Sequence, residues 1–283
     1  MRASLKYIFL YLSLILADFL VLKLIAVGIE DKCGFDLMAD GTWMDSLAFL
    51  LISQLIPLYV FVKRKYASLS FKLNYSFGDD FSIKKLYQWS ALACVGCLLF
   101  DGMLQVLLPL EQLDLYVFGS IPDLEDNNFI DVVSACVMAP LVEESVCRGA
   151  IERRLLEKYR NPWIGVVISA IIFSLLHFNF EQGIQTGGLI LGWVYYRTRN
   201  LWPCIFIHAL NNILATILPD GWTEPPMPIA IVVAIVSGAA LLYGAKKIYD
   251  ITRDRTPLYV PVELPPALPS EAVDQQPEST PAD

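Results

Sequence analysis

Histidine is scarce in this chain of 283 residues, which contains only His177 and His208. The formal net charge is -8 and no basic patch is present, so nothing in the composition suggests nucleic-acid binding. HExxH and GxSxG patterns are both absent, which excludes the standard signatures of helical zinc proteases and of serine hydrolases. The cysteines are scattered, most of them in apolar stretches, and predict no disulfide framework.

Apolar residues dominate instead, at 55% of the chain with a mean hydropathy of +0.51. Soluble domains average about 45–50%, and a helix needs about 20 largely apolar residues to cross a bilayer. Reading the apolar runs between charged clusters predicts an all-α polytopic bundle of about eight spans. We expect them at residues 7–28, 47–62, 89–110, 129–147, 162–178, 183–196, 201–218 and 229–245.

Charged residues alternate in sign from loop to loop. Lys and Arg gather near positions 2–6, 63–65, 84–85, 153–160, 197–199 and 246–247, whereas Asp and Glu gather near 30–36, 111–126 and 220–224. Because basic residues concentrate in cytoplasmic loops, the pattern predicts that both termini are cytoplasmic. The expected partner is a lipid bilayer, and a bacterial inner membrane is the hypothesis for its identity.

Ionisable groups within the fourth predicted span need a partner or a function, because insertion costs about 2.5–3.5 kcal/mol each. Glu144 and Arg148 are four residues apart and predict an ion pair on one helix face. Glu143 is turned by about 100°, so we do not expect one helix to aim both carboxylates at the same partner. Glu144 is then structural and Glu143 available for chemistry, with Pro140 expected to kink the helix before them. The alternative is a solvated cytoplasmic helix end.

The two histidines occur in apolar segments, His177 four residues after Phe173 and Asn212 one turn beyond His208. A carboxylate can take a proton from water, an imidazole can relay it, and neutral donors can stabilise an oxyanion. A membrane histidine can also serve only in packing. Counted along upright helices, His177 lies deeper than Glu143 or His208, a mismatch that helix tilt and a longer fourth helix would reduce.

Three motifs follow one another in this region, EExxxR, FxxxH and HxxxN. In that order they resemble the CPBP family of intramembrane proteases, also called the CAAX-protease and bacteriocin-processing or Abi family, which includes Rce1-type prenyl-protein proteases. The residues that carry the resemblance are Glu143 and Glu144 with Arg148, Phe173 with His177, and His208 with Asn212.

The resemblance implies glutamate-dependent peptide hydrolysis within the membrane. Glu143 would be the general base, assisted by His177, while His208 and Asn212 would bind the oxyanion. The supporting residues would be Glu144, Arg148 and Phe173. The family is commonly described as metalloproteases, but its motifs fit a metal-free glutamate mechanism equally well. Zinc is an open cofactor hypothesis, with Glu143, His177 and His208 as ligands and one position left for water.

The chain is accordingly divided into an N-terminal transmembrane region (1–128), a catalytic membrane core (129–218), a C-terminal span (219–251) and a disordered Pro-rich acidic tail (252–283). The expected substrate is a peptide or protein, either CAAX-type and prenylated or a peptide or bacteriocin precursor. Three rival readings remain: an ion- or proton-coupled transporter using the buried Glu and His groups, a cytochrome with His177 and His208 as haem ligands, and an inactive scaffold.

Overall fold

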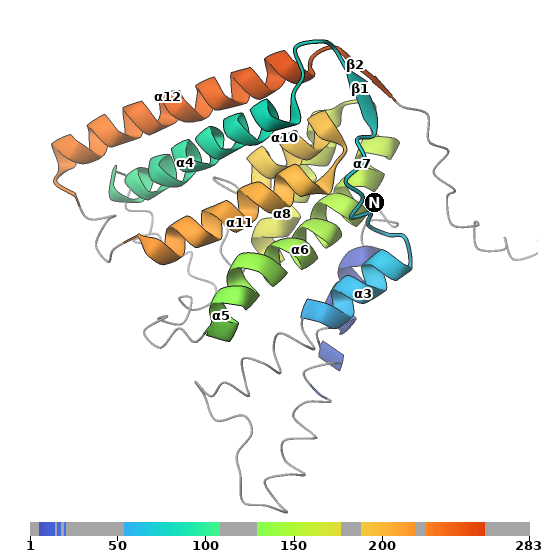
Figure 1. The fold of residues 1–283 in the computed structure, drawn as a ribbon. Coiled ribbons are helices and arrows are strands. Elements are labelled where there is room, and N and C mark those ends of the chain that lie inside the picture. The colour runs from blue at the N-terminus through green and yellow to red at the C-terminus, as the bar shows by residue number, and fades with distance from the viewer. Residues whose placement is uncertain are drawn as a thin grey trace, which may run out of the picture.

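The computed structural model describes residues 6–14, 16–17, 20, 54–107, 129–176, 188–218 and 225–257. This part of the chain is mostly helical (Figure 1), in agreement with the all-α prediction. Residues 6–14 are helical. The further elements are α3 (Ile56–Lys63), β1 (Tyr75–Phe77), α4 (Ile83–Leu107), α5 (Phe129–Val133), η4 (Ser134–Met138), α6 (Ala139–Glu144), η5 (Ser145–Glu152), α7 (Arg153–Lys158), α8 (Pro162–Leu176), α10 (Leu189–Thr198), α11 (Leu201–Ile217), α12 (Met227–Thr252) and β2 (Arg255–Pro257).

Two helices in the described ranges are long and apolar enough to cross a membrane, at Ile83–Leu104 and Met227–Thr252. Shorter apolar helices lie at Pro162–Leu175 and Leu201–Ile217. These helices coincide with the third, eighth, fifth and seventh predicted spans, although α4 begins before the predicted third span and α12 extends past both ends of the eighth. A membrane protein is supported, whereas the count of eight spans and the cytoplasmic termini stay predictions.

Helices α4 and α12 lie side by side along most of their length (Figure 1), and glycines make this approach possible. A Cβ on Gly96 would stand 2.6 Å from the backbone nitrogen of Leu241 and 2.8 Å from the Ser237 oxygen. On the outer face of α12, Ile235 and Val236 are exposed. Small residues inside and large apolar residues outside are typical of helices that pack within a lipid bilayer.

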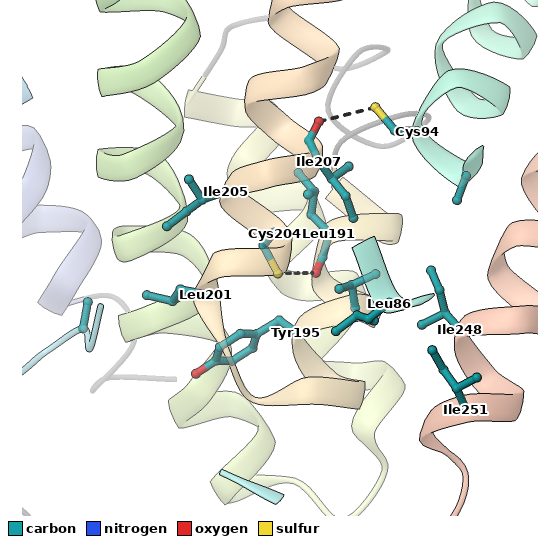
Figure 2. Packing of buried hydrophobic residues seen from close by; sticks show 13 residues of the cluster. Leu86, Cys94, Leu191, Tyr195, Leu201, Cys204, Ile205, Ile207, Ile248 and Ile251 are labelled. Carbon is teal, nitrogen blue, oxygen red and sulfur yellow. Dashed lines mark hydrogen bonds between the residues drawn. The ribbon is translucent and has the colours of Figure 1, made fainter. Parts of the chain in front are cut away.

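Helix α11 lies between α4 on one side and the η4 and α6 segment on the other. Its first half packs with α10 in a buried apolar cluster (Figure 2), which includes Leu191, Leu201 and Cys204. The Cys204 thiol donates to the Leu191 carbonyl at 3.4 Å. This packing holds α11 in the middle of the bundle. Two polar residues described below, His208 and Asn212, lie at the middle and in the second half of the helix.

Three loops meet at one end of the bundle. Asn200 caps α11 through the backbone N–H of Trp202 and donates its amide to the carbonyls of Ser70 and Lys72. Nearby, β1 pairs antiparallel with β2. The first residues of the predicted tail therefore complete α12 and form β2, while residues 258–283 lie outside the described ranges.

Candidate active site

The predicted fourth span, residues 129–147, lies in one helical run from Phe129 to Lys158 that includes two π-helical segments. These segments, η4 and η5, lie on either side of α6. Pro140 lacks an N–H and would crowd the carbonyl of Cys136 in an α-helix, which is a physical reason for the wider turn before it. The helix continues past Arg148 to Lys158, which is one of the two features expected to reduce the depth mismatch of the histidines. Every residue of η5 is buried.

Arg148 makes the ion pair that its spacing from Glu144 predicts. Its Nη1 lies 2.9 Å from Glu144 Oε1, and both side chains are 0% exposed. Its Nη2 donates to the Gly188 carbonyl at 3.2 Å, and the guanidinium stands 4.4 Å from the ring centre of Phe173. The Arg148 guanidinium therefore connects η5 with α8, through Phe173, and with Gly188, the residue that precedes α10.

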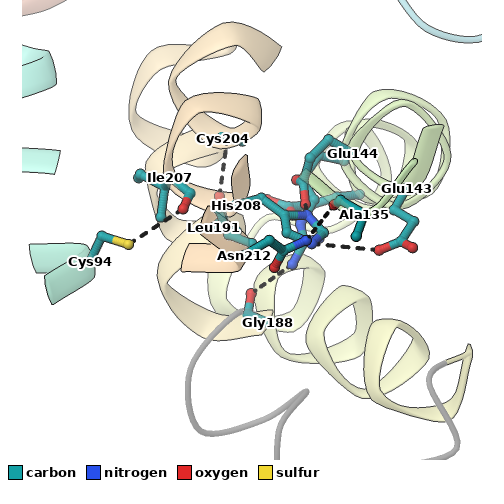
Figure 3. A network of polar contacts seen from close by, with 12 residues as sticks. Cys94, Ala135, Glu143, Glu144, Gly188, Leu191, Cys204, Ile207, His208 and Asn212 are labelled. Carbon is teal, nitrogen blue, oxygen red and sulfur yellow. Dashed lines mark hydrogen bonds and ion pairs between the residues drawn. The ribbon is translucent and has the colours of Figure 1, made fainter. Parts of the chain in front are cut away.

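His208 lies between the two glutamates, one at each ring nitrogen (Figure 3). Its Nδ1 is 2.9 Å from Glu144 Oε1 and its Nε2 is 3.7 Å from Glu143 Oε2. The expectation that one helix cannot aim both carboxylates at the same partner is wrong. An imidazole has two nitrogens on different edges of the ring, so carboxylates on different faces of α6 can each reach one of them.

The two glutamates differ in exposure. The side chain of Glu144 is 0% exposed and that of Glu143 is 21% exposed. When Nδ1–H donates to Glu144, a neutral His208 presents an acceptor at Nε2 towards Glu143. Glu143 is thus the carboxylate that a small molecule can approach, and it faces the nitrogen through which a proton can pass.

Asn212 follows His208 on α11 and contacts the helical run that carries the glutamates (Figure 3). Its Nδ2 donates to the Ala135 carbonyl at 2.8 Å. Phe173 packs edge-on against the His208 ring, with the centres 5.5 Å apart. The structure brings together six of the seven residues singled out in the sequence, and His177 lies outside the described residues. Those six are Glu143, Glu144, Arg148, Phe173, His208 and Asn212.

Glu152 is a residue of this cluster that the sequence motifs missed. Its Oε2 lies 4.0 Å from Arg148 Nε, and both side chains are 0% exposed. Gly192 of α10 makes room for this carboxylate, because a Cβ there would be 2.9 Å from Oε2. The signal was present in the sequence, since Glu152 follows Arg148 at the same four-residue spacing that separates Arg148 from Glu144.

The zinc hypothesis concerns Glu143, His177 and His208. In the part of the chain that the structure describes, no group of three or more His, Cys, Asp or Glu side chains is arranged to hold a metal ion. Glu143 and His208 provide two suitable donor types side by side, and the third expected ligand, His177, is not among the described residues. Zinc binding by these three residues therefore stays a hypothesis.

Comparisons with known proteins match the same region. Residues 125–214 match a family model described as Type II CAAX prenyl endopeptidase Rce1-like. A Bacillus subtilis (strain 168) protein named "Putative membrane peptidase YdiL" is 28% identical over 118 residues, which cover 38% of this chain and 48% of that protein. The chain thus spans about half the length of this relative. No solved structure matches the chain. The resemblance drawn from the motifs is confirmed, and a membrane protease kind of function is supported.

Proposed function

We propose that this chain is an intramembrane endopeptidase that hydrolyses a membrane-associated peptide or protein. The observation that carries the proposal is the contact of His208 with both Glu143 and Glu144 in a largely buried setting. Ionisable groups placed in such surroundings are rare and usually functional. The matched family model and the membrane-peptidase relative favour peptide hydrolysis over transport.

In the proposed reaction Glu143 is the general base. It removes a proton from water, the resulting hydroxide attacks the carbonyl carbon of the peptide, and a tetrahedral oxyanion forms. The C–N bond then breaks, and the proton held by Glu143 passes to the departing amine. The FxxxH motif assigns His177 as the residue that assists Glu143. The partial exposure of Glu143 supports its choice over Glu144.

His208 and Asn212 are the proposed oxyanion donors. His208 directs Nδ1 at Glu144, so it must be protonated on both nitrogens to donate from Nε2 as well. The Asn212 amide has two N–H groups, and the one that binds Ala135 leaves a second for the oxyanion. Glu144, Arg148 and Phe173 support these residues through the contacts described above.

Two classes of substrate fit the proposed site. A CAAX-type prenylated protein and a peptide or bacteriocin precursor both suit a site in the cytoplasmic half of a bacterial inner membrane. Purified protein in lipid vesicles should be offered a prenylated CAAX peptide, the same peptide without the prenyl group, and an apolar precursor peptide. Cleavage of the prenylated peptide alone would select the first class.

The catalytic assignment is tested in the same assay. We expect Glu143→Ala and His177→Ala to abolish cleavage, and Glu157→Gln, which alters a partly exposed carboxylate of the same helical run, to preserve it. Undiminished cleavage by both alanine variants would overturn the assignment. Chelation and metal analysis separate the two mechanisms, because a stoichiometric zinc ion required for cleavage would exclude the metal-free one.

A further inference from the structure

The helical run that carries the glutamates lacks one backbone hydrogen-bond donor next to η4, its first π-helical segment. In η4 the Ala139 N–H bonds the carbonyl of Ser134, five residues earlier, as in any π-helical turn. The next bond of that series would join the N–H of residue 140 to the carbonyl of Ala135. Residue 140 is a proline and has no N–H. The Ala135 carbonyl must therefore find its donor elsewhere.

Asn212 provides a donor at that place. Its Nδ2 lies 2.8 Å from the Ala135 oxygen (Figure 3), across the contact between α11 and η4. The Ala135–Asn212 contact is partly buried, and a carbonyl that is shielded from water and lacks a donor destabilises the fold. We propose that the Asn212 amide replaces the N–H that Pro140 lacks and so acts as a positioning residue, which deepens, and rests on, the proposed peptidase function.

The bond fixes α11 because a second contact lies one turn away. His208 and Asn212 share a face of α11, and the first contacts Glu144 of α6 while the second contacts Ala135 of η4. Two contacts on the two sides of Pro140 constrain both the rotation and the longitudinal position of α11 against η4 and α6. The proline turn thereby sets where His208 meets the glutamates.

Gln54 supports the same interpretation from another part of the chain. Its buried Nε2 donates to the Ser134 carbonyl at 3.4 Å. Side-chain amides thus approach two consecutive carbonyls of η4, the turn in which the helical hydrogen bonds are rearranged. The Ser134 carbonyl accepts from both the Ala139 N–H and Gln54, using two lone pairs, whereas the Ala135 carbonyl, which Pro140 deprives of its π-helical donor, accepts from Asn212.

The Asn212 amide can serve both proposed roles. Its nitrogen carries two N–H groups in one plane. The bond to Ala135 occupies one and holds the plane of the amide, which orients the second N–H. The positioning role therefore concerns the first N–H, and the oxyanion role of the proposed function concerns the second.

A double-mutant cycle between residues 140 and 212 tests the positioning role. Pro140→Ala restores a backbone N–H to the turn, so the Asn212 amide should matter less for stability in that background. We expect Asn212→Ala to lower the melting temperature of the detergent-solubilised full chain by about 2–4 °C with Pro140 present. With Pro140→Ala the same substitution should lower it by less than half as much. Asn211→Ala, the neighbouring asparagine, should leave the melting temperature unchanged in both backgrounds.

Equal losses from Asn212→Ala in the two backgrounds would overturn the proposal. Pro140→Ser supplies the same N–H and repeats the test if Pro140→Ala does not fold. Failure of both to fold would also overturn it, since the ring and not the missing N–H would then define the turn. Peptide cleavage is measured separately. Coupling without any cleavage would uphold the positioning bond and count against the proposed function.

Discussion

Glu144 and His208 lie 64 residues apart in the chain, and Oε1 of the first is 2.9 Å from Nδ1 of the second. The same oxygen accepts from Arg148 Nη1, also at 2.9 Å. One carboxylate oxygen thus joins the ion pair of the EExxxR motif to the histidine of the HxxxN motif. Replacing any one of Glu144, Arg148 and His208 should therefore disturb the contacts of the other two.

Glu143 and Glu144 should respond differently to the loss of their charge. Glu144→Gln leaves the fully buried Arg148 without its close carboxylate, and breaking a buried pair costs about 3–5 kcal/mol. We expect a lower melting temperature together with loss of cleavage. Glu143→Gln affects a partly exposed side chain and should slow cleavage by about 100-fold or more with little change in melting temperature. Equal melting temperatures for both variants would contradict the buried, structural role of Glu144.

Arg148→Lys should not rescue the site, although it keeps the positive charge. The guanidinium reaches Glu144, the Gly188 carbonyl and the face of Phe173 at once. A lysine ammonium is a point charge that lacks the planar fork for such contacts. We expect cleavage to fall about tenfold or more, since losing one charged hydrogen bond of about 1.5–3 kcal/mol has an effect of that order. Arg154→Lys, on the partly exposed face of α7, is the control and should retain activity.

Gly192→Ala should damage the cluster from the side of α10. The added methyl carbon would stand 2.9 Å from Glu152 Oε2 and would push that carboxylate against its neighbours. We expect a loss of about 1–3 kcal/mol in stability, as for other overpacked interiors. In a Glu152→Ala background, Gly192→Ala should lower the melting temperature by less than it does in the unsubstituted chain, because the clash is absent there. An equal loss in both backgrounds would show that Glu152 is not the group that Gly192 accommodates.

Gly96→Ala should separate α4 from α12. Its Cβ would meet backbone atoms of Leu241 and Ser237 at less than 3.0 Å, and backbone cannot yield by a side-chain rotation. Gly238→Ala is a matched comparison on the same pair of helices, because its Cβ would stand 3.2 Å from the Phe100 ring. Thermal unfolding in detergent should show a clearly larger loss for Gly96→Ala. A reversed order would contradict the packing of this helix pair.

Periodic and local features of the site could be predicted from the sequence. The apolar runs predicted the positions of α4, α8, α11 and α12, and the four-residue spacing predicted the contact between Glu144 and Arg148. Both depend on neighbours along one helix, where geometry follows directly from the number of residues between two side chains.

Contacts that involve the backbone of another helix could not be predicted in the same way. The Ala135 carbonyl met by Asn212 and the Gly188 carbonyl met by Arg148 carry no signal in side-chain type. The spacing of the two glutamates does not predict the double contact of His208, because an imidazole presents nitrogens on two edges of its ring and each can meet a carboxylate from a different helix face. Each of these contacts depends on how helices align, which the order of residues does not specify locally.

Single-turnover cleavage of one membrane-associated peptide in H₂¹⁸O tests the central claim most directly. The peptide is the one that the vesicle assay selects, and Glu143→Gln is compared with the unsubstituted chain and with Glu157→Gln. We predict that the unsubstituted chain and Glu157→Gln place one ¹⁸O atom in the new carboxylate, because water is the nucleophile. Glu143→Gln should be slower by about 100-fold or more, the range of general-base catalysis. Cleavage by Glu143→Gln at the unsubstituted rate would contradict the account.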